Sequence, residues 1–179
     1  MYRSIFVGLR VEPDADMAAS LRETVLAPLQ GRSASIEDFS NLHITVCFLG
    51  KAHVPDAMRL FNQGCETLDL EGSGPLFLDF HRVAAFGSAK QAVKVIYAEP
   101  TPAERLSKIM AAFAGKGSDA YREQKPHVTV ARLGSIIDSQ WAVSALVGSP
   151  LRGQGRVDGV CLLANDGSGL YRTLAFKSF

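Results

Sequence analysis

Two stretches of the chain, NLHITVCFLG at residues 41–50 and PHVTVARLG at residues 126–134, follow one pattern. Each holds a His, an aliphatic residue, a Thr and a Val in succession, and each ends in Leu-Gly at the same offset. His43 and His127 stand 84 residues apart, close to half of the 179-residue chain. Two unrelated core histidines would have no reason to share these neighbours. The repeat therefore predicts two similar lobes that each contribute one His-x-Thr strand to a shared cleft.

The paired motifs carry groups that suit acid–base chemistry at phosphorus. Residues two apart on a strand point to the same face, so Thr45 accompanies His43 and Thr129 accompanies His127. Histidine titrates near neutral pH, which lets one imidazole act as a base while the other acts as an acid. Two Thr hydroxyls can hold the non-bridging oxygens of a phosphate between the rings, as an in-line displacement requires. This chemistry needs no metal, and we expect no cofactor.

The segments around the motifs combine strands, helices and hairpins. Hydrophobic periodicity and turn residues predict strands at 4–11, 41–49 and 127–134, helices at 13–29, 55–68, 102–113 and 139–147, and hairpins at 75–99 and 156–179. The hairpins favour antiparallel pairing over a doubly wound parallel sheet. We therefore expect one α+β domain over residues 1–179, with motifs at 43–46 and 127–130. It should have two pseudo-symmetric lobes, each an antiparallel sheet with helices on its outer face, and the sheets should face each other across a central cleft.

The composition is that of an ordinary globular chain, with 47% hydrophobic and 21% charged residues. A net charge of +1 gives no broad attraction for a polyanion, so any contact with RNA has to be local. Cys47, Cys65 and Cys161 form no C-x-x-C motif and indicate buried thiols in a reducing cytoplasm. The first residues lack the apolar core of a signal peptide, and no stretch approaches the roughly 20 apolar residues of a membrane span. We expect a cytoplasmic monomer without membrane contact.

In these motifs the chain resembles the two-histidine phosphoesterase superfamily. Within it, NLHITVCFLG and KPHVTVARL resemble the signature strands of the RNA 2′,3′-cyclic phosphodiesterases, also called LigT-like 2′-5′ RNA ligases. The opening IFVGLRV and the closing GLYRTLAFKSF are similar to the first and last strands of that family, and the resemblance covers most of the chain. It implies an enzyme that hydrolyses 2′,3′-cyclic phosphates at RNA ends to 2′-phosphates without a metal, with weak reversible 2′-5′ ligation.

The resemblance also implies roles for the four motif residues. His43 and His127 are the implied catalytic pair, and Thr45 and Thr129 are the implied phosphate-binding residues. In that family the N-terminal histidine is assigned to protonate the leaving O3′ and the C-terminal histidine to activate water. The sequence itself leaves the acid and the base unassigned, and exchanging them reverses which oxygen leaves.

Two further residues, Arg132 and Phe48, each lie five positions after a motif histidine. They resemble a phosphate-binding arginine and a base-stacking aromatic of the family. On a strand with strictly alternating side chains, a residue five positions after the histidine points to the opposite face. For both residues to line the cleft, each strand must bulge or end between +2 and +5, and the repeat predicts one shared bulge. The alternatives are a solvated arginine and a core phenylalanine.

Other substrates and a non-catalytic role stay open at this point. Loops decide whether the substrate is an RNA terminus, a short nucleotide, ADP-ribose 1″,2″-cyclic phosphate or a 2′-5′-linked oligonucleotide. A module that binds RNA ends without turnover is the alternative from another class. His53 and His81 lack a Thr at +2 and are expected to be structural or exposed. Three residues before the second motif are candidates for the border of the cleft: Tyr121, Arg122 and Lys125.

Overall fold

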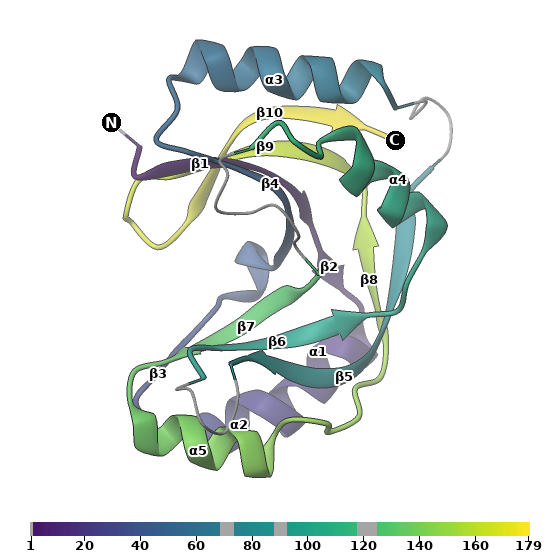
Figure 1. The fold of residues 1–179 in the computed structure, drawn as a ribbon. Helices are drawn as coiled ribbons and strands as arrows, with labels where there is room; N and C mark the ends of the chain where they lie inside the picture. Colours follow the sequence, from purple (N-terminus) through teal and green to yellow (C-terminus); the bar gives the residue numbers. More distant parts are fainter. Residues whose placement is uncertain (1, 69–73, 88–92, 118–124) are drawn as a thin grey trace.

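The computed structural model describes residues 2–68, 74–87, 93–117 and 125–179 (Figure 1). Its strands are β1 (Ser4–Arg10), β2 (Glu12–Pro13), β3 (Ala34–Ile36), β4 (His43–Gly50), β5 (Leu76–Phe86), β6 (Val95–Pro100), β7 (Val128–Leu133), β8 (Gln154–Val157), β9 (Gly159–Asn165) and β10 (Tyr171–Ser178). Its helices are α1 (Ala15–Leu21), the π-helical η1 (Arg22–Leu26), α2 (Ala27–Leu29), the 3-10 helix η2 (Phe39–Asn41), α3 (Val54–Glu66), α4 (Glu104–Ala112) and α5 (Ile136–Ala145).

The strands form one continuous path in the order β10-β9-β1-β4-β7-β6-β5-β8-β2, with β3 beside β7. Every pairing between these strands is antiparallel. The path curls, so that the half from β10 to β4 faces the half from β7 to β2 (Figure 1). The predicted α+β class with two facing antiparallel sheets is confirmed. The structure adds that the two sheets are continuous with each other.

Two long segments run through both halves of the sheet. Residues 4–10 pair with β4 and β9, whereas residues 12–13 pair with β8. Likewise, residues 154–157 pair with β5 and residues 159–165 pair with β1. The single strand predicted from residue 156 onward is therefore divided at Asp158, because its two parts have partners in different halves. The strands β2 and β3 were not predicted, since two or three residues are too few for a periodic pattern.

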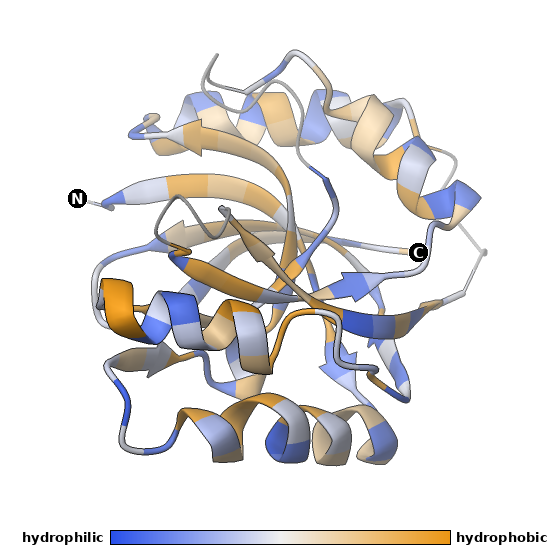
Figure 2. Cartoon of the chain, turned by 60° about the horizontal axis from the view of Figure 1, so that its bottom comes forward, coloured by the Kyte–Doolittle hydropathy of each residue, from blue (hydrophilic) through white to orange (hydrophobic). Residues whose placement is uncertain are grey.

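The helices cover the outside of the curled sheet (Figure 1). α3 packs against β1 and β9, and α4 packs against β4, so both cover the first half. α1 contacts β2 and β8, and α5 contacts β7, so these cover the second half. Figure 2 shows both hydrophilic and hydrophobic residues along the helices, as expected where one face packs on a sheet and the other meets water. In the described ranges, these four α-helices all pack on the outer face of the sheet.

The first predicted helix is present and runs from Ala15 to Leu29 through a π-helical turn at 22–26. Asp14 begins it, because its carboxylate accepts a hydrogen bond from the backbone N–H of Met17 at 2.7 Å. The four apolar residues predicted to share a face are all buried: Met17, Leu21, Val25 and Leu29. The last predicted helix begins earlier than expected, at Ile136, because the Ser135 hydroxyl caps it.

Both predicted hairpins are present in the described residues. The hairpin predicted for 75–99 is formed by β5 and β6, and residues 88–92 between them lie outside the described residues. The C-terminal hairpin is formed by β9 and β10. All three cysteines are buried and free of disulfides. Among the described residues, no helix is long and apolar enough to cross a membrane.

Candidate functional site

The two motif strands meet at the centre of the curled sheet. β4 and β7 are antiparallel, and Ile44 is paired with Val128. Both of these side chains are 0% exposed and belong to the core. Their neighbours along each strand therefore point to the opposite, inner face. The antiparallel register brings together all four motif residues on this face, with His43 opposite Thr129 and Thr45 opposite His127.

Each motif strand carries one extra residue after its threonine. The pairing of β4 with β1 skips Val46, and the pairing of β7 with β6 skips Val130. These two valines hold the same position in the repeat, three residues after the motif histidine. The shared bulge predicted from the sequence is thus confirmed. Because a bulge shifts the alternation by one residue, it turns Phe48 and Arg132 to the face of the histidines.

The two imidazoles are held in the same way. Nδ1 of His43 lies 2.7 Å from the carbonyl oxygen of Asn41, and Nδ1 of His127 lies 2.9 Å from the carbonyl oxygen of Lys125. A carbonyl oxygen can only accept, so Nδ1 of each neutral ring carries the proton and donates it. Nε2 is then an acceptor in both rings. The arrangement leaves each Nε2 available to take or return a proton.

Each imidazole also lies against one Phe and one Tyr ring. The centroid distances are 5.1 Å from His43 to Phe6, 4.8 Å from His43 to Tyr171, 4.7 Å from His127 to Phe86 and 5.3 Å from His127 to Tyr97. No contact between these four aromatics and the histidines was predicted from the sequence. Phe6 and Tyr97 come from β1 and β6, which pair with the motif strands, and their distances in sequence from the motif histidines differ between the halves.

Burial in this aromatic setting lowers the pKa of both histidines. The pKa of His43 falls to about 4, first because burial disfavours its charged form and then because His127 and Arg10 oppose a further positive charge. The hydrogen bond to Asn41 works in the opposite direction. Burial likewise lowers the pKa of His127. Both lowered pKa values favour the neutral form of the rings in the free protein.

The threonines complete the cluster at its centre. Thr129 is 8% exposed and Thr45 is half-buried. Neither hydroxyl has a hydrogen bond to another protein group among those found in the described residues, so both can serve a ligand. Two hydroxyls and two Nε2 atoms around one point can grip a tetrahedral anion and exchange protons with its outer oxygens.

Arg132 lies on the inner face, but its guanidinium is already paired. It forms an ion pair with Glu37, whose side chain is only 13% exposed. The arginine is itself exposed at the edge where β7 meets β3. The structure therefore shows the guanidinium of Arg132 engaged by Glu37.

Phe48 is half-buried on the inner face of β4. It is paired with Phe6 across β1 and packs against the small cluster of Phe6, Cys161 and Leu163. Because Phe6 touches the His43 ring, Phe48 lies at the edge of the aromatic group around that histidine. The position agrees with a base-stacking role and also with simple packing.

A buried carboxylate organises the approach to the second motif. Glu99 on β6 is 6% exposed and is bound by Arg82, Lys125 and, at 3.7 Å, His81. The hydrogen bond from Arg82 is the main reason that the pKa of Glu99 falls to about 2. His81 is exposed, one of the two alternatives expected for it, and the ammonium group of Lys125 is paired with Glu99. Tyr121 and Arg122 lie outside the described residues.

Two other expectations concern the surroundings of the site. His53 lies just before α3 and is exposed, away from the motif strands. Within the described ranges, no three His, Cys, Asp or Glu side chains are grouped so that they could hold a metal ion.

No family model matches the chain, and no curated protein matches it. Among solved structures, E. coli LigT in complex with 3′-AMP is 15% identical with a TM-score of 0.70, and the match covers 100% of this chain and 99% of LigT. TT0787 of Thermus thermophilus is 18% identical with a TM-score of 0.67, covering 98% and 97% of the two chains.

Kluyveromyces marxianus Usb1 is more distant, at 12% identity and a TM-score of 0.61, with 97% of this chain and 98% of Usb1 covered. These matches span nearly the whole of each protein, so the chain has the complete fold of LigT and Usb1. The resemblance seen in the sequence motifs is thus confirmed at the level of the fold.

Proposed function

We propose that the chain is a metal-independent phosphodiesterase that opens 2′,3′-cyclic phosphates at RNA ends and leaves a 2′-phosphate. One observation carries this proposal. Two His-x-Thr strands are paired antiparallel, and both histidines have Nδ1 fixed by a backbone carbonyl two residues earlier. A site that only bound a nucleotide would not need two imidazoles with equivalent, free Nε2 atoms.

The proposed reaction uses one ring as base and the other as acid. Nε2 of the neutral ring takes a proton from water while the water oxygen bonds to phosphorus. The bond from phosphorus to O3′ breaks, and Nε2 of the protonated ring gives its proton to O3′. The product carries a 2′-phosphate and a free 3′-hydroxyl, and the two rings have exchanged protonation states. A proton transfer through solvent restores the starting state.

The remaining motif residues would hold the phosphate during this step. Thr45 and Thr129 donate their hydroxyls to the non-bridging oxygens, and Arg132 adds a guanidinium once it leaves Glu37. Phe48 would stack on the base of the terminal nucleotide. E. coli LigT has been solved with 3′-AMP and with ATP, which supports a nucleotide ligand for this fold. In 2′-5′ ligation a 5′-hydroxyl would take the place of water in the same displacement, O3′ would again leave, and the reverse reaction would cleave the 2′-5′ bond.

The test is hydrolysis of an oligoribonucleotide that ends in a 2′,3′-cyclic phosphate, measured in EDTA. The variants are His43→Ala and His127→Ala, with His53→Ala as the matched control outside the site. We expect each motif variant to lose at least about a hundredfold in rate, the usual contribution of a general acid or base, and the control to keep its rate. Protection of the cyclic phosphate without turnover by the wild type would indicate a binding module instead.

Mapping the product of the same reaction assigns the two roles. A 2′-phosphate is expected, and in the related family it goes with the N-terminal histidine as the acid. A 3′-phosphate would mean that O2′ leaves and that the substrate binds in the reverse orientation. Neither outcome changes the requirement for both histidines.

A further inference from the structure

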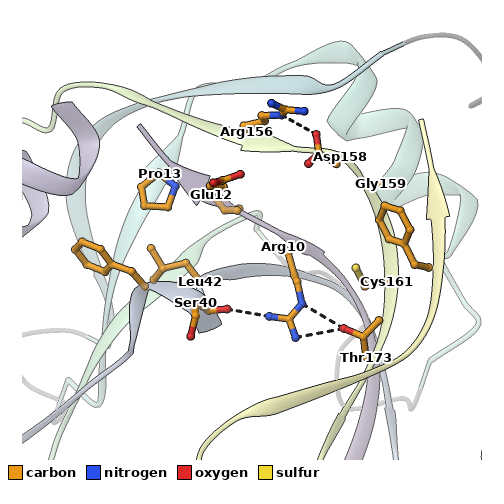
Figure 3. Close-up of a pocket in the computed structure, with 13 residues that line it drawn as sticks. Arg10, Glu12, Pro13, Ser40, Leu42, Arg156, Asp158, Gly159, Cys161 and Thr173 are labelled. Atoms are coloured by element: carbon orange, nitrogen blue, oxygen red, sulfur yellow. Dashed lines mark hydrogen bonds and ion pairs between the residues drawn. The ribbon is translucent and has the colours of Figure 1, made fainter. Parts of the chain in front are cut away.

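A pocket of about 620 Å³ opens on the inner face of the sheet (Figure 3). It is lined by η2, by the segment from β1 to β2, by β8 and β9, and by β10. Arg10, which is paired with His43 across β1 and β4, forms its side nearest the motif. The volume lies within the range of about 300–1,000 Å³ that is typical of small-ligand sites. The catalytic step proposed above leaves this pocket unused.

Arg10 brings a fixed and uncompensated positive charge to the pocket. Its guanidinium donates to the carbonyl oxygen of Ser40 at 2.8 Å and lies 3.3 Å from the hydroxyl of Thr173 (Figure 3). It also donates to the carbonyl oxygen of Tyr171 at 2.6 Å. All three partners are neutral. In the part of the chain that the structure describes, no carboxylate forms an ion pair with Arg10. A guanidinium that is held rigidly by neutral acceptors is a strong site for an anion such as a phosphate.

The other parts of the pocket suit a nucleoside. Phe176 on β10 lines it and is 54% exposed, so much of its ring is open to a ligand. An open aromatic ring beside a cation is the usual platform on which a nucleic-acid base stacks. Glu12 and the ion pair of Arg156 with Asp158 line another part of the pocket (Figure 3). Their carboxylates would repel a second phosphate there but can accept hydrogen bonds from a ribose hydroxyl or a base amino group.

We propose that this pocket binds the nucleotide that precedes the terminal one. In this arrangement, which rests on the proposed function, the cyclic phosphate lies at the two motifs and the internucleotide phosphate binds Arg10. The base of the preceding nucleotide stacks on Phe176. The preferred substrate is then an oligoribonucleotide of at least two nucleotides, and a cyclic mononucleotide leaves the pocket empty.

The test compares kcat/KM for adenosine 2′,3′-cyclic phosphate, for the diadenosine dinucleotide ending in a 2′,3′-cyclic phosphate, and for ADP-ribose 1″,2″-cyclic phosphate. The wild type is measured with Phe176→Ala and Arg10→Gln. Matched controls are Ile137→Ala, an exposed apolar residue on α5, and Arg59→Gln, an exposed arginine on α3. Arg10 also donates hydrogen bonds to two backbone carbonyls, so its replacement can lower the rate on every substrate. The effect of Arg10→Gln is therefore judged by the ratio of kcat/KM for the dinucleotide to kcat/KM for the mononucleotide.

We expect the wild type to prefer the dinucleotide and each pocket variant to lower that ratio at least about fivefold, while the controls leave it unchanged. Equal kcat/KM values of the wild type for the dinucleotide and the mononucleotide would overturn the second-nucleotide site. A preference for the dinucleotide that persists in the pocket variants would also overturn it. Neither result would contradict the proposed phosphodiesterase activity. A Phe176-dependent preference for the ADP-ribose compound would reassign the pocket to a nucleoside diphosphate.

If the protein turns over none of these substrates, the proposed function is wrong, but the pocket can still be tested by measuring binding directly. Calorimetry then compares adenosine 2′-phosphate with the dinucleotide that ends in a 2′-phosphate. Tighter binding of the dinucleotide that is lost in Phe176→Ala supports the pocket. Equal affinities for the two ligands refute it.

Discussion

Ile44 of β4 is paired with Val128 of β7, and this pair joins the two halves of the sheet at the candidate site. Since the motif residues flank this pair on both strands, it sets the distance between the two histidines. Both side chains are fully buried, so the joint is held by core packing as well as by backbone hydrogen bonds. A change in this packing should therefore affect the site more than an equal change elsewhere in the core.

Val128→Ala should lower the free energy of unfolding by about 1–3 kcal/mol, the cost of emptying part of a packed core. Val160→Ala on β9 is the matched control, because Val160 is equally buried but lies away from the motifs. Denaturant unfolding should give similar losses for the two variants. Cyclic phosphate hydrolysis should fall several-fold more in Val128→Ala. Equal activities in the two variants would show that the joint does not set the geometry of the site.

The repeat in the sequence predicted two lobes that each contribute one motif strand to a shared cleft. The shared bulge followed from the repeat together with the resemblance of Arg132 and Phe48 to cleft residues of the family. The repeat was informative because His43 and His127 carry the same neighbours, so each strand supports the interpretation of the other. The division of residues 154–165 could not be predicted, because the local pattern is the same whichever sheet a strand joins. The aromatic rings around the histidines come from strands distant in sequence, and their spacing to the motifs differs between the halves. Pairing between such strands is set by tertiary packing.

The pH dependence of activity should reflect the lowered histidine pKa values. Turnover needs one neutral and one protonated ring, so kcat/KM should be greatest between the two free-enzyme pKa values. His43 has a pKa of about 4, and the pKa of His127 lies below its usual 6.5. We expect kcat/KM to be greatest on the acidic side of pH 6.5 and to decline toward neutral pH. A maximum above pH 7 would contradict the burial of the rings. Arg10 favours a neutral His43, so the profile with Arg10→Gln should shift toward higher pH.

Stability should fall as the pH decreases from about 6.5 to about 4. In this window an unfolded His43, with a pKa near 6.5, binds a proton that the folded ring does not yet bind. Because the unfolded state holds more protons, unfolding is favoured progressively as the pH falls. Urea unfolding at pH 7 and pH 5 measures the effect. His43→Gln should lose less stability over this interval than the wild type does. If His43→Gln loses as much stability as the wild type between pH 7 and pH 5, burial does not hold the His43 ring neutral.

Glu99→Gln should weaken both the fold and the activity. The substitution leaves Arg82 and Lys125 without their shared carboxylate, which should cost about 1 kcal/mol in the free energy of unfolding. Lys125 also provides the carbonyl that fixes Nδ1 of His127, so its release should lower kcat more than it raises KM. Glu104→Gln removes an exposed pair with Lys108 and is the control that should leave kcat unchanged. If kcat in Glu99→Gln matches the wild type, the carboxylate supports only the fold.

The pairing of Arg132 with Glu37 gives a way to decide whether Arg132 acts in phosphate binding. If it does, Arg132→Gln should raise KM about tenfold, because a charge-assisted hydrogen bond to the phosphate is lost. Glu37→Gln should have the opposite effect and lower KM, since the guanidinium no longer has a competing partner. Both variants lose the same ion pair, so any shared loss of stability in thermal unfolding cancels in the comparison. If KM moves in the same direction in both, the arginine serves the structure and the phosphate is held by the threonines alone.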